Sequence, residues 1–159
     1  MRHDPGLTIV GRAARVTLVA CVAFYLCRYV LGNVTMAPYA LFGVVAMGAL
    51  SQIPGSAAER ARTLLAVLPV GWLLVTLGTL LSVSTATAVA GMFVLGFAVA
   101  FAGIGGPRLV GLATGTQLLY ILPCFPPFDP GSLGFRLAGL TLGVLLLAAA
   151  EVTDRKSVV

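Results

Sequence analysis

The chain has 159 residues, of which 59% are apolar and only 9% are charged, and its formal net charge is +5. Soluble domains carry about 25% charged residues, so this composition excludes an ordinary water-soluble protein and is typical of a membrane protein. The longest uncharged run extends from Thr63 to Pro107. It is too long for one membrane span of about 20 residues and suits two.

Apolar segments separated by turn signals predict an all-α integral membrane protein with six transmembrane helices and no soluble domain. The chain divides into a cytoplasmic or interfacial N-terminal segment, a six-helix membrane module and a short cytoplasmic tail, covering residues 1–13, 14–151 and 152–159.

The first two spans are bounded by helix breakers. The first is predicted over residues 14–31 and ends at Gly32-Asn33. The second is predicted over residues 36–53, with Pro38 in the first turn, where proline is tolerated. Ile53-Pro54-Gly55 ends it.

The third helix begins with a sequence signal for its N-terminus. Ser56 and Glu59 form the capping-box pattern S-x-x-E, and the helix is predicted to continue to Leu81. Pro69, with Gly71 close behind, removes one backbone hydrogen bond and predicts a kink. The kink is either structural or a hinge for movement.

The remaining three spans are predicted over residues 86–103, 108–122 and 133–151. A short hairpin at residues 82–87 precedes the fourth helix, and Gly103 to Pro107 separate it from the fifth. Asp129-Pro130-Gly131-Ser132 is typical of a tight turn with a positive φ at Gly131, and Ser132 is a candidate cap for the sixth helix.

Basic residues indicate the orientation. With the N-terminus inside, the inner segments carry eight Lys or Arg residues and the outer segments carry only Arg28 and Arg136. The positive-inside rule therefore predicts that both termini are cytoplasmic. The basic charge is explained by topology and anionic lipid, and no nucleic-acid partner is expected.

Small residues at a four-residue spacing mark two helices. They occur as Gly111-x-x-x-Gly115 in the fifth helix and Gly139-x-x-x-Gly143 in the sixth. Such faces allow helix backbones to approach closely in a membrane, so these four glycines are predicted to be helix-packing positions.

The residues needed for catalysis are scarce. The only histidine is His3, and the five acidic residues all lie in tails, loops or helix ends, as Asp4, Glu59, Asp129, Glu151 and Asp154. The three cysteines have no metal-binding spacing. We therefore expect no enzyme activity, no catalytic residue, no metal and no cofactor.

Polar side chains near membrane depth are positive or neutral. Arg108 and Arg136 lie at helix ends, and Thr114 and Gln117 lie within the fifth span. Arginine at a pore mouth concentrates anions and repels cations. These four residues are the candidate substrate path. The alternative is that the arginines extend to the interface and that Gln117 bonds a neighbouring helix.

The stretch GPRLVGLATGTQLLYILPCFPPFDPGSLGFRLAGL, residues 106 to 140, resembles the fusaric acid resistance-like (FUSC) family, also called aromatic acid exporters. The arginine-bearing segment before the first helix and the basic loop after the second are also similar to this family. The resemblance implies a bacterial inner-membrane efflux protein, distantly like the aluminium-activated malate transporters of plants. Typical members repeat the six-helix module and add cytoplasmic domains, so a single module implies a homodimer.

The loop between the last two helices is unusually rich in proline, which limits the conformations of an unfolded loop. We predict that it forms a rigid outer rim, whose residues are Pro123, Phe125, Pro126, Pro127, Phe128 and Asp129.

Two functions follow. The first is a transporter or channel that exports organic or aromatic carboxylate anions. The second is a non-transporting membrane subunit that scaffolds or stabilises a partner in the membrane or the cytoplasm.

Overall fold

The protein is described from a computed structural model that covers residues 5–51, 53, 55–125 and 127–154, with side chains described from residue 9 onward except those of Arg108 and Asp154. Throughout these ranges the regular structure is helical, and no strand is present. The all-α prediction is confirmed for this part of the chain.

The element order matches the predicted one. The six α-helices are α1 (Pro5–Tyr25), α2 (Met36–Val44), α3 (Ala57–Leu81), α4 (Thr85–Ala102), α5 (Pro107–Ile121) and α6 (Leu133–Asp154). Two π-helical segments continue α1 and α2 as η1 (Leu26–Val30) and η2 (Val45–Leu50). Three 3₁₀ turns lie in the connections, as η3 (Gly103–Gly105), η4 (Leu122–Cys124) and η5 (Pro130–Ser132).

The first two helices differ from their predicted bounds. α1 begins at Pro5 rather than at residue 14, because nothing after Pro5 breaks a helix and proline is tolerated in a first turn. Arg12 is accommodated because its Nη2 atom donates to the carbonyls of Gly48 and Ser51, at 3.0 Å each. The second helical segment ends at Leu50, before the predicted residue 53, since Ser51 is extended.

The predicted N-terminus of α3 is confirmed. The Ser56 hydroxyl accepts from the backbone N–H of Glu59, and the Glu59 carboxylate accepts from the N–H of Ser56 at 2.8 Å. A second capping box, between Ser84 and Thr87, begins α4, so the predicted hairpin shortens to residues 82–84.

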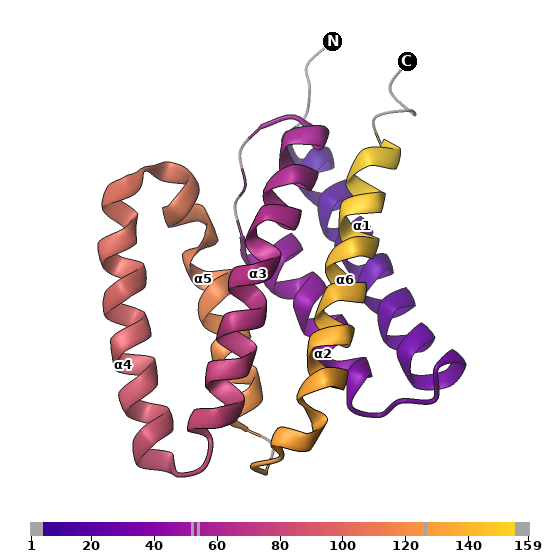
Figure 1. Cartoon of the computed structure of the whole chain (residues 1–159). Helices are drawn as coiled ribbons and strands as arrows, with labels where there is room; N and C mark the ends of the chain where they lie inside the picture. Colours follow the sequence, from indigo (N-terminus) through magenta and orange to yellow (C-terminus); the bar gives the residue numbers. More distant parts are fainter. Residues whose placement is uncertain (1–4, 52, 54, 126, 155–159) are drawn as a thin grey trace.

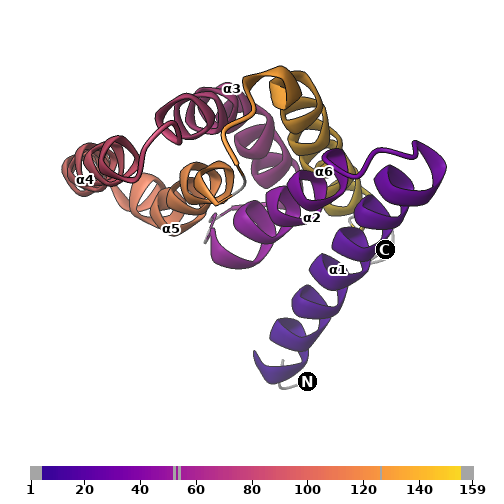
Figure 2. The same ribbon diagram turned by 90° about the horizontal axis from the view of Figure 1, so that it is seen from below.

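The helices form a bundle in which α2, α3, α5 and α6 are central and α1 and α4 lie at opposite edges (Figures 1 and 2). The start of α1, the segment before α3, the α4–α5 connection and the end of α6 lie at one end, which we name the basic end (Figure 1). The opposite end carries the loop of residues 122–132, and we name it the proline end.

Close contacts between helices depend on glycine. A Cβ atom added at Gly139 or Gly143 of α6 would collide with the backbone of Met36 or Ala40 in α2. One added at Gly115 of α5 would collide with Ala46 in η2. Gly115, Gly139 and Gly143 therefore pack against the same helical segment, residues 36–50, whereas Gly111 lines a groove beside this segment and its packing role stays a prediction.

Four helical segments are long and apolar enough to cross a membrane, namely Ile9–Val30, Ala57–Leu81, Thr85–Gly105 and Pro130–Thr153. The helical segments Met36–Leu50 and Leu109–Cys124 are apolar but shorter. A helix of 15 residues is about 23 Å long, less than the hydrocarbon thickness of about 30 Å. The structure thus has the composition of a membrane protein, while six complete spans and their orientation remain predictions.

Candidate functional site

Arg136 occupies the first turn of α6 and is only 2% exposed. Its Nε atom donates to Ser132 Oγ at 2.8 Å, and its Nη1 atom donates to Thr79 Oγ1 of α3 at 3.1 Å. The guanidinium carbon lies 5.5 Å from the centroid of the Tyr39 ring in α2. We name these four residues the arginine cluster.

The cluster solvates the guanidinium without neutralising it. The Thr79 hydroxyl donates its proton to the Val75 carbonyl at 2.8 Å, and the Ser132 hydroxyl donates to the Asp129 carbonyl at 2.9 Å. Both hydroxyl oxygens therefore present lone pairs to Arg136. Within the described residues, no carboxylate lies within ion-pair distance of this arginine. A buried charge without a counter-charge is costly, so the cluster is suited to receive an anion.

The Tyr39 hydroxyl adds a second unusual feature. Tyr39 is 3% exposed, and its hydroxyl has no hydrogen-bond partner among the described residues. Buried polar atoms nearly always have a partner, and an unsatisfied one is often explained by a bound water or ion. The hydroxyl is thus a free donor beside a buried cation.

Helix ends add to the positive potential. α2 begins at Met36 and α6 begins at Leu133, so Tyr39 and Arg136 lie in the first turns of two helices. Helix N-termini carry partial positive charge and favour anions. α3 ends nearby at Leu81, and its partial negative charge offsets only part of this field.

The proline loop is attached to the cluster at both ends. Pro123 is buried against Gly78, where an added Cβ would lie 2.6 Å from the Pro123 ring. Gly78 directly precedes Thr79, and at the other end Ser132 bonds Arg136 itself. The loop is therefore anchored beside the cluster at both of its ends.

The predicted rim residues divide between buried and exposed positions. Pro123 is buried, whereas Phe125 is 82% exposed and Phe128 is 46% exposed. Pro127 and Asp129 are also exposed. Pro126 lies outside the described residues.

The turn before α6 differs from its prediction. Positive φ values occur at Gly32, Gly55 and Gly106 but not at Gly131, because residues 130–132 form a 3₁₀ turn that any residue can adopt. Its cap is the Asp129 carboxylate, which accepts from the Gly131 N–H at 3.1 Å. The predicted cap, Ser132, uses its hydroxyl for Arg136 and the Asp129 carbonyl.

The other predicted path residues lie on α5, and within the described residues no hydrogen bond joins Thr114 or Gln117 to Arg136. Thr114 is exposed and Gln117 is half-buried, on a helix that packs against α3, α4 and η2. Arg108 is the second residue of α5, and its side chain lies outside the described residues. Of the four predicted residues, the arginine cluster includes Arg136 alone.

The predicted hinge residues lie within a continuous helix. Pro69 is inside α3, which extends unbroken from Ala57 to Leu81. Gly71 is buried, and an added Cβ would contact the side chains of Leu119 and Leu140 at 3.2 and 3.1 Å. Gly71 therefore has a packing role, and movement at this position stays a prediction.

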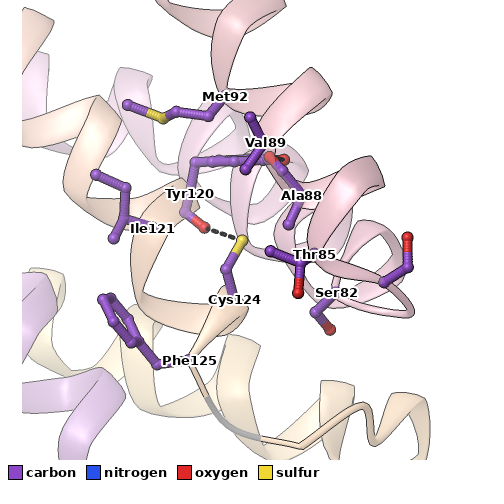
Figure 3. A pocket seen from close by; sticks show the side chains of 10 residues that line it. Ser82, Thr85, Ala88, Val89, Met92, Tyr120, Ile121, Cys124 and Phe125 are labelled. Atoms are coloured by element: carbon purple, nitrogen blue, oxygen red, sulfur yellow. Dashed lines mark hydrogen bonds between the residues drawn. The ribbon is translucent and has the colours of Figure 1, made fainter.

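A small pocket of about 270 Å³ opens between the α3–α4 turn and the end of α5 (Figure 3). Ser82, Thr85, Tyr120 and Cys124 line it, and the Tyr120 hydroxyl donates to the Ala88 carbonyl at 2.9 Å. The Cys124 thiol contacts the carbonyl oxygens of Tyr120 and Gly78, at 3.3 and 3.7 Å. Gly78 thus contacts Cys124 of this pocket and directly precedes Thr79 of the arginine cluster.

The basic end contains a contrasting charged group. Glu151 of α6 is 6% exposed, and its Oε2 atom accepts from Arg60 Nε and Nη2 of α3 at 2.9 and 2.7 Å. Arg15 Nη1 of α1 lies 3.6 Å from the same oxygen. We name these three residues the ion-pair cluster. It joins the start of α3 and the end of α6 to the middle of α1.

Sequence reasoning named Arg136 and Glu151 but missed Tyr39 and Thr79, since nothing in an apolar helix distinguishes a tyrosine that faces a buried cation. The described residues bring together no group of three or more side chains able to hold a metal ion. In comparisons with known proteins, no family model, no curated protein and no solved structure matches this chain.

Proposed function

We propose that this protein is a multi-pass membrane transporter or channel for organic or aromatic carboxylate anions, and that the arginine cluster is its anion site. The observation that supports this most is the buried Arg136, which has no carboxylate partner among the described residues and lies over the ring of Tyr39, whose hydroxyl is also unpaired.

The chemistry of the cluster suits a carboxylate. Arg136 uses two of its N–H groups on hydroxyls, and a guanidinium has about five such donors in a planar fork that matches a carboxylate. The Tyr39 hydroxyl supplies another donor. An anion bound here would neutralise the charge and satisfy the hydroxyl together.

The proposed orientation has six spans with both termini in the cytoplasm of a bacterium and the proline end outside. The described residues Arg12, Arg15 and Arg60 at the basic end support it, because cytoplasmic ends of membrane helices are enriched in arginine. The start of α1 and the C-terminus of α6 both lie at the basic end (Figure 1). This arrangement is consistent with an even number of membrane crossings. Membership of the FUSC family and a homodimer remain part of this proposal.

The cluster is occluded, so transport requires an opening step. The proline loop is the segment best placed for it, because one end packs against Gly78, the neighbour of Thr79, and the other end supplies Ser132. Displacement of this loop would expose Arg136 to the outside while the ion-pair cluster keeps the basic end closed.

The test is flux of benzoate, a small aromatic carboxylate, from proteoliposomes that contain this chain alone. Flux that follows an imposed membrane potential supports an anion pathway, and flux that needs a pH gradient supports a proton-coupled transporter. A folded preparation that gives no flux under either gradient would contradict the proposal.

A second candidate function is a non-transporting subunit, and α4 favours it. None of the residues of α4 is buried, and Phe93, Phe97 and Phe101 are 67% to 78% exposed on one face. Such a helix meets either lipid or a partner protein. Purification from native membranes distinguishes the two functions, because a scaffold would retain another protein at fixed stoichiometry.

A further inference from the structure

A groove lies between α1, η2 and the start of α5, away from the arginine cluster. Its volume is about 1050 Å³, and its walls are mostly apolar, with Arg12 and Thr17 as polar side chains. The start of α1 projects away from the rest of the bundle on this side (Figure 2). Water needs two to four polar partners to occupy a cavity stably, and these walls offer few. An apolar occupant is therefore expected.

A positive charge lies in this groove. Arg12 lines it and is exposed, and both of its hydrogen bonds, to the carbonyls of Gly48 and Ser51, use the Nη2 atom. Among the described residues, Nε and Nη1 have no other partner. The guanidinium is thus fixed in place, with donors left for an anion.

We infer that this groove binds an anionic phospholipid, with an acyl chain along the apolar walls and the phosphate at Arg12. Arg12 lies in the N-terminal half of α1, and the start of this helix is at the basic end (Figure 1), where a headgroup of the same leaflet would be found. Basic pockets between membrane helices on the cytoplasmic side recognise anionic headgroups in this way. The inference depends on embedding in a membrane and not on anion transport.

Cys21 provides a direct probe. It is exposed and lines the groove, whereas Cys27 is buried and Cys124 is half-buried. The experiment measures alkylation of Cys21 by N-ethylmaleimide in micelles doped with dioleoylphosphatidylglycerol or dioleoylphosphatidylcholine. Native mass spectrometry counts the lipids that stay bound. We expect phosphatidylglycerol to be retained and to slow alkylation, and phosphatidylcholine to do neither.

Arg12→Gln should weaken phosphatidylglycerol binding about fivefold, the effect of one basic group near an anionic surface. Arg28→Gln is the matched control, because this arginine lies in η1 at the other end of the molecule, and it should leave binding unchanged. Since Arg12 also holds η2, Thr17→Phe is a second variant. It fills the groove from an exposed position and should abolish lipid retention without removing the charge.

Three results would overturn the inference. The first is equal retention of the two lipids, and the second is unchanged phosphatidylglycerol binding in both Arg12→Gln and Thr17→Phe. The third is protection of Cys21 in a lipid-free dimer, which would assign the groove to a second copy of the chain.

Discussion

Helix α6 has a buried charged residue near each end, and the two differ in their partners. One has partners of opposite charge, and the other has none among the described residues. Glu151 at the basic end accepts hydrogen bonds from Arg60 and lies close to Arg15, so its charge is fully compensated. Arg136 at the proline end contacts two hydroxyls and an aromatic ring. The first arrangement is complete in itself and ties helices together. The second lacks a counter-charge, which is what a site for a mobile anion requires.

The largest effect is expected from removing the charge of the ion-pair cluster. Glu151→Gln leaves two arginines without their carboxylate and should lower the free energy of unfolding by about 3 kcal/mol, at the low end for breaking a buried pair because both arginines are partly exposed. Thermal or denaturant unfolding in detergent measures it. Asp129→Asn, which keeps the side-chain oxygen that caps the turn before α6, is the control and should change stability by less than about 0.5 kcal/mol. Equal destabilisation by both variants would contradict the structural role of Glu151.

Arg136 should respond in the opposite way. Arg136→Met removes a buried charge that has no counter-charge and keeps a similar shape, so stability should be unchanged or higher. Flux of benzoate should fall about 100-fold, as expected for the loss of hydrogen bonds to a charged group. Arg28→Met, at an exposed arginine, is the control in the flux assay. If Arg136→Met is destabilised but its flux per folded molecule equals that of the native protein, Arg136 has a structural role and does not bind the anion.

Tyr39→Phe is a smaller change to the arginine cluster, because it deletes only the unpaired hydroxyl. Stability should not fall, because no hydrogen bond of the folded protein is lost among the described residues. Benzoate affinity should drop about tenfold, the value of one hydrogen bond to a charged group. Tyr29→Phe, at an exposed tyrosine, should have no effect. A clear loss of stability in Tyr39→Phe would show that the hydroxyl already has a partner.

The smallest effect is expected at the proline loop beside the arginine cluster. Replacing Pro126 and Pro127 with alanine should change benzoate flux about two- to fivefold by loosening the loop, while expression stays constant. Pro107→Ala, at an exposed proline that begins α5 at the basic end, is the control. Unchanged flux in the double variant would contradict the prediction that the proline loop forms a rim that affects transport.

Local signals in the sequence predicted most of the fold. The order of the helices, and most of their bounds to within a few residues, followed from local features. These features are the lengths of the apolar segments, the breaks at Gly32 and Gly103, and the capping box at Ser56 and Glu59. The errors occurred where local signals compete with tertiary contacts. Arg12 is accommodated within α1 because it finds carbonyl partners at Gly48 in η2 and at Ser51 directly after η2, and these residues are distant in sequence.

The candidate site was predictable only in part, for the same reason. Arg136 is conspicuous as a charge in an apolar stretch, but its partner Thr79 is 57 residues away and its aromatic contact, Tyr39, lies on another helix. Gln117 and Thr114 were also conspicuous, yet α5 places them away from Arg136. Pairings between helices depend on packing faces, here the contact of Gly139 and Gly143 with α2, and packing partners are not encoded in any local pattern.

The most direct test of the central claim is equilibrium binding of radiolabelled benzoate to the purified chain, compared with Arg136→Met and Arg136→Lys. We predict saturable binding to the native protein, loss of binding in Arg136→Met with the fold retained, and weakened binding in Arg136→Lys, where the charge remains but the planar fork is lost. Benzoate binding of the same strength in Arg136→Met would show that the anion does not meet this arginine, and would contradict the account.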